Sequence, residues 1–192
     1  MNTDLPFLFF WNPERSLLDV DTILDITKNV KTYKKGDLIV SAGTIYENFF
    51  LIDKGLVKQC QSINGKESIL NFFHEGSCCT ILESFQKKTP ATSYIVAIEE
   101  TELFSISFDE ITKLRAKSKK FNQLFNDIFI WGSAVIVSRL KSMYEKDKIK
   151  AYEDFLKQNK QIVQRISLGD VANYLGITLV HLSRIRGNYK KH

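Results

Sequence analysis

The chain has 192 residues, of which 44% are hydrophobic, a composition that is ordinary for a globular protein of one or two domains. Its three cysteines are too few and of the wrong parity for a disulfide scaffold, so a reducing, cytoplasmic location is expected. The first residues carry no basic charge, and the longest apolar run, 128–137, is about half of the ~20 residues that span a membrane. We therefore expect neither a signal peptide nor a membrane partner.

The first half of the chain predicts a β domain. Residues 19–29 are expected to form a short amphipathic helix. From Val30 to about Phe108, glycines recur every seven to twelve residues between short apolar runs, a pattern typical of β sandwiches and barrels. Asn64-Gly65 predicts a two-residue hairpin turn. The expected strands include 38–40, 49–52, 56–60, 69–73 and 94–98.

Helices are predicted after Phe108. A short helix over 109–117 precedes a long helix from Lys119 to about Tyr144, and a charged hinge at 145–148 leads into a helix over 149–158. Apolar residues recur every three or four positions along the long helix, as in a coiled-coil seam. We predict that this seam joins two copies of the chain, and the alternative is that it only forms monomer core. The predicted interface residues are Phe121, Leu124, Ile128, Trp131, Val135 and Ser138.

Residues 166–186 have the pattern of a helix-turn-helix, the motif that places its second helix in the major groove of DNA. Ala172 is small enough for a close helix crossing, and Gly176 can take the positive φ of a tight turn. Ser167 with Asp170 predicts a capping box for the first helix, and Thr178 predicts a cap for the second. The apolar seam between the two helices is Val171, Leu175, Ile177, Leu182 and Ile185.

The excess positive charge lies in the same part of the chain. Between Lys160 and His192 there are six basic residues and one acid, so this segment carries the whole net charge of +5. Phosphates attract such a segment, although a basic solvated tail is the alternative explanation. The helical pattern favours DNA binding. The expected partners are double-stranded DNA and a second copy of the chain.

The order of these elements resembles the Crp/Fnr family of bacterial transcription regulators, relatives of the cyclic-AMP receptor protein. The resemblance covers nearly the whole chain from about residue 20, and its most specific parts are 33–39, 49–57, 64–76 and 175–185. It implies a sequence-specific regulator that binds a palindromic operator as a homodimer, with an effector shifting the population of DNA-competent states. It also implies RNA polymerase as a partner. The alternative is a cyclic-nucleotide-type sensor that acts through protein partners.

The resemblance implies an α+β fold in three parts. Residues 1–117 would form a double-stranded β-helix, or jelly-roll, effector domain of the cyclic-nucleotide-binding type with flanking helices. Residues 118–146 would form a long dimerisation helix and hinge. Residues 147–192 would form a helix-turn-helix domain without a full wing, because the sequence ends soon after Arg186.

The residues that hold cyclic nucleotides in this family are replaced here. Relatives bind the ribose with a Glu and the cyclic phosphate with an Arg-Ser pair, and these positions fall on Ile81 and on Ala91-Thr92. Without its Arg, a buried phosphate loses a bidentate, charge-assisted contact. We therefore predict that the domain does not bind cyclic AMP in the usual way, and an unknown small-molecule effector stays open. The predicted effector pocket is Thr80, Ile81, Leu82, Ala91, Thr92 and Tyr94.

No cofactor, metal site or catalytic group is predicted. An iron–sulfur cluster needs about four cysteine ligands, and the histidines show no zinc or haem spacing. Cys78-Cys79 is either a thiol switch or, as we favour, a pair of small buried residues. Lys87-Lys88 could bind an acidic effector, but a solvated loop is the commoner explanation. The chain lacks nucleotide-binding and hydrolase signatures, so we expect no enzyme.

The DNA-contacting surface also departs from the family. Where relatives carry polar base-contacting residues, this chain has Leu179 and Val180, which cannot donate hydrogen bonds but can contact thymine methyl groups. Arg184 matches a family arginine that contacts base or phosphate, and it is the strongest single candidate. The predicted DNA-binding residues are Ser167, Thr178, Leu179, Val180, His181, Ser183, Arg184, Arg186 and Lys190.

Overall fold

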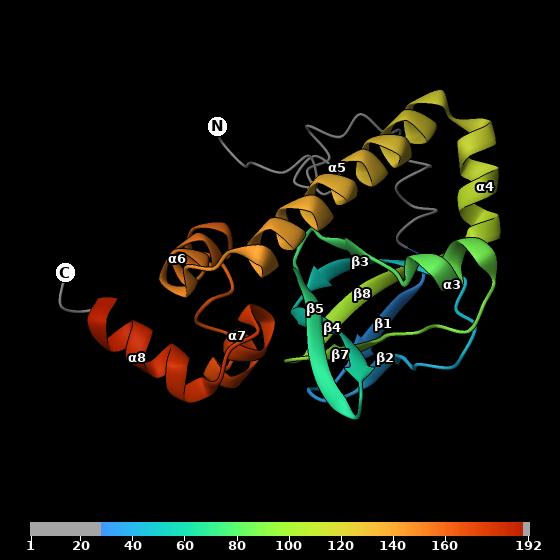
Figure 1. The fold of residues 1–192 in the computed structure, drawn as a ribbon. Helices are drawn as coiled ribbons and strands as arrows, with labels where there is room; N and C mark the ends of the chain where they lie inside the picture. The colour runs from blue at the N-terminus through green and yellow to red at the C-terminus, as the bar shows by residue number, and fades with distance from the viewer. Residues whose placement is uncertain (1–27, 190–192) are drawn as a thin grey trace.

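The computed structural model describes residues 28–189, which form a β domain, one long helix and a C-terminal helical domain (Figure 1). The helix predicted over 19–29 lies outside the described residues, apart from Lys28 and Asn29, which are not helical. Lys190 also lies outside them. In the part of the chain that is described, no helix is both long and apolar enough to cross a membrane.

The β domain consists of two four-stranded antiparallel sheets. Both sheets contribute to a buried apolar cluster that contains Phe50, Ile52, Val57, Ile95 and Leu103. This arrangement confirms the predicted β domain. The first sheet has the order β1 (Val30–Tyr33), β8 (Thr101–Ser107), β3 (Asn48–Lys54), β6 (Cys78–Cys79). The second has the order β2 (Leu38–Val40), β7 (Tyr94–Ala97), β4 (Leu56–Ile63), β5 (Lys66–His74).

The hairpin between β4 and β5 forms where it is predicted. Asn64 and Gly65 have φ values of 53° and 75°, and Ile63 pairs with Lys66 across the turn. Two consecutive positive φ values match the twist of the flanking strands, which is why Asn-Gly is favoured at such a turn. The hairpin makes β5 the edge strand of its sheet, with one side free to meet another element.

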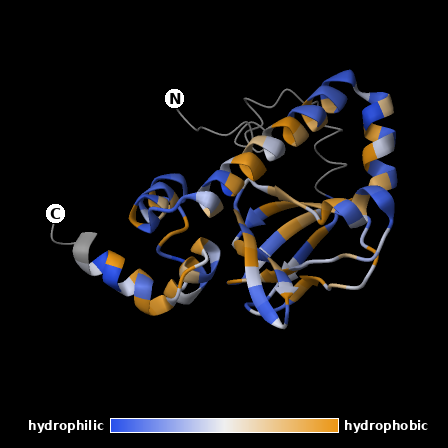
Figure 2. Cartoon of the chain, viewed as in Figure 1, coloured by the Kyte–Doolittle hydropathy of each residue, from blue (hydrophilic) through white to orange (hydrophobic). Residues whose placement is uncertain are grey.

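Two helices follow strand β8 along the chain. A capping box between Ser107 and Glu110 begins α4 (Phe108–Lys117), and the Ser118 side chain caps α5 (Lys119–Tyr144), which has 26 residues. The first part of α5 packs on the β domain through a cluster that includes Phe49, Phe85, Phe121 and Phe125. Hydrophobic stretches nevertheless continue along α5 (Figure 2). A short helix that the sequence does not predict, α3 (Leu82–Lys87), contributes Phe85 to this cluster.

The C-terminal domain contains three helices, α6 (Lys148–Gln158), α7 (Leu168–Leu175) and α8 (Leu179–Tyr189). The Asp147 carboxylate accepts hydrogen bonds from the first N–H groups of α6, so the predicted hinge is the point where a new helix begins. In Figure 1, α7 lies between α8 and the β domain.

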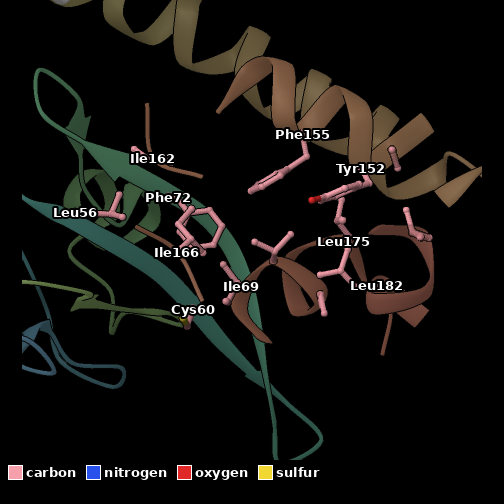
Figure 3. Close-up of a cluster of buried hydrophobic side chains, with 14 residues drawn as sticks. Leu56, Cys60, Ile69, Phe72, Tyr152, Phe155, Ile162, Ile166, Leu175 and Leu182 are labelled. Atoms are coloured by element: carbon pink, nitrogen blue, oxygen red, sulfur yellow. The ribbon is translucent and has the colours of Figure 1, made fainter. Parts of the chain in front are cut away.

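The apolar core crosses from the β domain into the C-terminal domain (Figure 3). The Phe72 ring on β5 lies 5.3 Å from the Tyr174 ring on α7 and 6.4 Å from the Phe155 ring on α6. The two parts of the chain therefore share one core in this structure, although the predicted boundary at 146–147 falls in the connection between α5 and α6. The shared cluster includes Leu56, Cys60, Ile69 and Phe72 on one side and Tyr152, Phe155, Ile162, Ile166, Leu175 and Leu182 on the other.

Candidate nucleic-acid interface

The turn between α7 and α8 has the geometry of a helix-turn-helix. Gly176 ends α7 with a φ of 67°, and its N–H and that of Ile177 return to carbonyls of the last turn of α7. Thr178 begins α8, since its hydroxyl oxygen accepts the N–H of His181 at 3.2 Å. The predicted roles of Gly176 and Thr178 are confirmed.

The two helices of the motif meet along an apolar seam. Val171, Ala172 and Leu175 on α7 are buried, as are Leu182 and Ile185 on α8. Because α8 has 3.6 residues per turn, the positions opposite Leu182 and Ile185 form one outward line at spacings of three and four residues. This line, which we call the contact stripe, consists of Val180, Ser183, Arg184 and Gly187.

The structure exposes most of the residues that are predicted to contact DNA. Val180 has 62% of its surface exposed and Leu179, beside the contact stripe, has 49%. His181, Ser183 and Arg184 are also exposed, whereas Arg186 is half-buried. Within the described part of the chain, no ion pair or hydrogen bond engages the Arg184 guanidinium. Ser167 and Thr178 are exposed too, but their hydroxyl groups cap the two helices.

Gly187, the last member of the contact stripe, is not among the residues predicted from the sequence to contact DNA. It is exposed, and a Cβ built on it would meet nothing within 4 Å. Its position could have been inferred from the sequence, because it lies seven residues after Val180 and three after Arg184, spacings that share one face of a helix.

The polar residues of α7 bind the chain's own β domain. The Ser167 hydroxyl accepts the N–H of Asp170 at 3.0 Å, but the Asp170 carboxylate accepts from Lys58 on β4, at 2.9 Å. The predicted capping box is therefore only half correct, because a cation on a neighbouring strand competes for the carboxylate. The Lys58 ammonium also donates to Glu67, so three charges from two domains meet at one point.

Asn173 joins α7 to the edge of the second sheet. Its side-chain oxygen accepts the N–H of Ile69 at 2.8 Å, and its side-chain nitrogen donates to the carbonyl of Glu67 at 2.9 Å. Both groups belong to β5, whose outer edge would otherwise present unpaired backbone groups. The Asn173 side chain thus forms the two backbone hydrogen bonds that an adjacent strand would otherwise make with this edge.

Arg165 forms a second polar link between the domains. It donates to both carboxylate oxygens of Glu75, at 2.9 and 2.8 Å, and also pairs with Glu99. Partial burial opposes ionisation of Glu75, but the bonds from Arg165 and from the N–H of Gly55 outweigh it and lower the pKa of Glu75 to about 2. Arg165 is one of the six basic residues counted above as an attraction for phosphate, but in the structure it pairs with these two acids.

Arg139 of α5 lies where the long helix, β5 and α7 meet. Its guanidinium stacks on the Tyr174 ring with the carbon 3.6 Å from the ring centre, and it donates to the Tyr174 carbonyl. Its Nε and Nη1 are buried and find no acceptor among the described residues. Burial lowers the pKa of this guanidinium. The junction therefore holds a cation without a carboxylate partner in the described part of the chain.

The residues predicted for an effector pocket differ in burial and in hydrogen-bond partners. Ile81 and Ala91 belong to the buried core of the β domain, with 1% and 4% of their surfaces exposed. Tyr94 donates its hydroxyl hydrogen to Glu67, near the C-terminal domain. Apolar side chains surround Ile81 and Ala91, and the effector pocket stays a prediction. Of the other three, Leu82 is exposed, Thr80 donates to the Asn48 carbonyl and Thr92 donates to Glu83.

Cys78-Cys79 and Lys88, for which an effector role is the less favoured alternative, have contacts within the chain. Burial raises the pKa of the Cys79 thiol to about 12 and that of Cys78 well above its usual range, which disfavours the reactive thiolate. Lys88 pairs with Glu47 at 2.9 Å and lies over the Phe108 ring. Among the described residues, no cluster of three metal-ligating side chains forms.

The residues predicted on α5 as a dimer interface divide between the chain's own core and its surface, so this interface stays a prediction. Phe121 is 3% exposed in the monomer core, and Leu124 and Ile128 pack against the same cluster. Val135 is half-buried, Ser138 is exposed, and the side chain of Trp131 is not described. The exposed apolar residues of α5 follow a different line, roughly opposite at 3.6 residues per turn. They are Ile130, Ile136, Val137, Leu140, Met143 and Tyr144.

Similarity to known proteins extends over most of the chain. Residues 30–118 match the cyclic nucleotide-binding domain family. The chain is 23% identical over 185 residues to the anaerobic regulatory protein of Haemophilus influenzae, covering 90% of this chain and 71% of that protein. It is 24% identical to the regulatory protein HlyX of Actinobacillus pleuropneumoniae, over 97% of this chain and 80% of that protein.

Solved structures show the same fold. FixK2 from Bradyrhizobium japonicum superimposes with a TM-score of 0.75 at 15% identity, covering 85% of this chain and 84% of that one. The matched domain and the curated relatives support a transcription regulator of the Crp/Fnr type. The β domain is the part that matches the cyclic nucleotide-binding domain family, and the helix-turn-helix of α7 and α8 is consistent with such a regulator. The curated Crp/Fnr relatives are regulatory proteins rather than enzymes.

Proposed function

We propose that this Crp/Fnr regulator binds a palindromic operator as a homodimer, with α8 of each subunit in the major groove and Arg184 as its main polar base contact. One observation carries the proposal. The buried residues of α8 face α7, while Arg184 lies exposed on the contact stripe without an ion-pair partner in the described chain. A guanidinium so placed can bind O6 and N7 of guanine, worth about 1–3 kcal/mol of discrimination.

Selection of bound sequences from a random DNA pool tests the proposal. We expect a palindrome whose half-sites lie about one helical turn apart. In gel-shift titrations on that operator, Arg184→Ala should lower the affinity at least tenfold. Lys157→Ala, which removes an exposed positive charge from α6 of the same domain, is the matched control and should change the affinity less than threefold. An equal loss of affinity in both variants would mean that Arg184 contributes only non-specific electrostatic attraction.

The exposed apolar face of α5 supports the homodimer. Ile130, Val137 and Tyr144 recur at heptad spacing and expose 70%, 51% and 83% of their surfaces. Such a line is the surface that two parallel helices cover in a coiled coil. Light scattering on variants at two neighbouring positions distinguishes this exposed face of α5 from the face predicted from the sequence. Val137→Glu should give monomers, whereas Ser138→Glu should leave the dimer intact. The reverse result would support the interface predicted from the sequence.

We also propose that the effector domain does not bind cyclic AMP in the way of its cyclic-nucleotide relatives. Ile81 and Ala91 are buried in apolar core, so neither position offers a carboxylate to ribose or a cation to phosphate. A phosphate buried there would lack its charge partner. Calorimetric titration with cyclic AMP should show no heat of binding, and micromolar affinity would contradict this proposal.

A further inference from the structure

We propose that the recognition helix α8 identifies its operator mainly through the 5-methyl groups of thymine, which Leu179 and Val180 contact, with Arg184 supplying the polar base contact. The inference rests on the proposed DNA-binding function and names the base chemistry that this surface fits. It predicts half-sites in which thymines lie next to the guanine that Arg184 binds.

The apolar residues lie where a groove-bound helix first meets the bases. Leu179 and Val180 form the start of α8, just after the turn, and the first residues of a recognition helix are the ones that contact base edges. Both expose about half or more of their surfaces, at 49% and 62%. Since α7 lies between α8 and the β domain, the chain's own core does not cover them (Figure 1).

The major groove offers one apolar group to such side chains. Thymine carries a methyl group at C5, whereas cytosine has only a hydrogen there and the purines present polar N7, O6 and N6 groups. A valine or leucine facing any of these polar groups would leave them without a hydrogen-bond partner. Thymine is therefore the base with which Leu179 and Val180 make a favourable apolar contact.

The remaining members of the contact stripe permit a close approach. Ser183 and Gly187 have short or absent side chains, and only Arg184 projects far from this line. Glycine inside a helix costs about 1 kcal/mol relative to alanine. Nothing among the described residues requires glycine at 187, because a Cβ there meets none of their atoms within 4 Å. A small residue at this position leaves room for a ligand that lies against α8.

A double-mutant cycle between protein and DNA tests the methyl contacts. In the selected operator, each thymine is replaced by deoxyuridine, which removes the methyl group and leaves every hydrogen bond intact. Wild-type protein should lose about three- to fivefold in affinity at each contacted thymine, the size expected for one buried methyl group. In Val180→Ala or Leu179→Ala, the penalty at the corresponding thymine should fall below twofold.

Ile149→Ala is the matched control, because it removes an exposed apolar side chain from α6 rather than α8 and should keep the full penalty. The methyl contact is overturned if deoxyuridine leaves the affinity of wild type unchanged, or if it lowers the affinity of all variants equally. Either result leaves the proposed DNA binding in place. Absence of any selected operator overturns the proposed function instead. All three substitutions alter exposed residues, so folding is preserved.

Substitutions of Gly187 test the close approach separately. Gly187→Ala should bind the operator within threefold of wild type, whereas Gly187→Leu should lose at least tenfold because its side chain stands between the helix and the bases. Thermal unfolding of both variants should occur at or above the wild-type temperature, since both residues favour helix more than glycine does. Full affinity in Gly187→Leu would show that α8 lies farther from the DNA.

Discussion

The two helices of the helix-turn-helix differ in what their polar residues do. On α7, Asp170 and Asn173 bind strands of the β domain, and Tyr174 stacks under Arg139 of the long helix. On α8, Arg184 and Ser183 are exposed on the contact stripe. The first helix thus fixes the motif to the effector domain and the second is left for a ligand. Through these contacts α7 connects the β domain to the exposed helix α8.

The largest expected effect comes from the buried side of α8. Leu182 is fully buried between α8 and the rest of the shared core. Leu182→Ala should lower the free energy of unfolding by about 2–5 kcal/mol, because it removes apolar contact and leaves a cavity. Urea titration followed by circular dichroism measures the loss. A loss below 1 kcal/mol would mean that α8 is not packed as the structure shows.

The polar link of α7 to the sheet edge should contribute less. Asn173→Ala leaves the Ile69 N–H and the Glu67 carbonyl without their partner, at a cost of about 1 kcal/mol, since water reaches this half-exposed site. Hydrogen exchange at the Ile69 amide should accelerate about fivefold or more. Asn126→Ala, whose side chain bonds Arg115 on the surface of α4, is the control and should leave that amide unchanged. Unaltered exchange in Asn173→Ala would remove the side chain from the domain contact.

Acid should weaken the second link. The pKa of Glu75 is about 2 in the folded chain, below its ordinary value of 4.5, so the unfolded chain binds a proton at higher pH than the folded one. The stabilisation is therefore complete above about pH 5 and is lost as the pH falls toward 2. Urea unfolding of wild type and Glu75→Gln should differ at pH 6 and converge near pH 2. Parallel curves across this range would show that the Arg165 pair does not stabilise the fold.

Local signals explain what the sequence predicts correctly. Asn64-Gly65 marks its hairpin, and Gly176 and Thr178 mark the turn of the helix-turn-helix, because each depends on the backbone of its immediate neighbours. The apolar runs and the glycine spacing predict the strands of the β domain correctly for the same reason. The short β6 and α3 have too few residues to give a periodic signal.

The contacts between domains could not be predicted, because they join residues that are far apart in the chain. Asn173 bonds residues 104 and 106 positions away, and no periodicity relates them. On α5 the apolar spacing predicted a helix but not which side faces its own core. The aromatic cluster around Phe121 takes one side, and that choice depends on the three-dimensional position of α4 and β3.

The smallest expected effect on stability belongs to the outer side of α8. Arg184→Ala and Val180→Ala change residues that expose their side chains, so each should alter the free energy of unfolding by no more than about 0.5 kcal/mol. Set beside Leu182→Ala, these variants separate the two sides of one helix, since the buried side determines folding and the exposed side determines binding. Urea titrations of the three variants under one condition measure the contrast. A loss above 1 kcal/mol in Arg184→Ala would mean that its guanidinium is engaged within the chain, and the operator contact would need another residue.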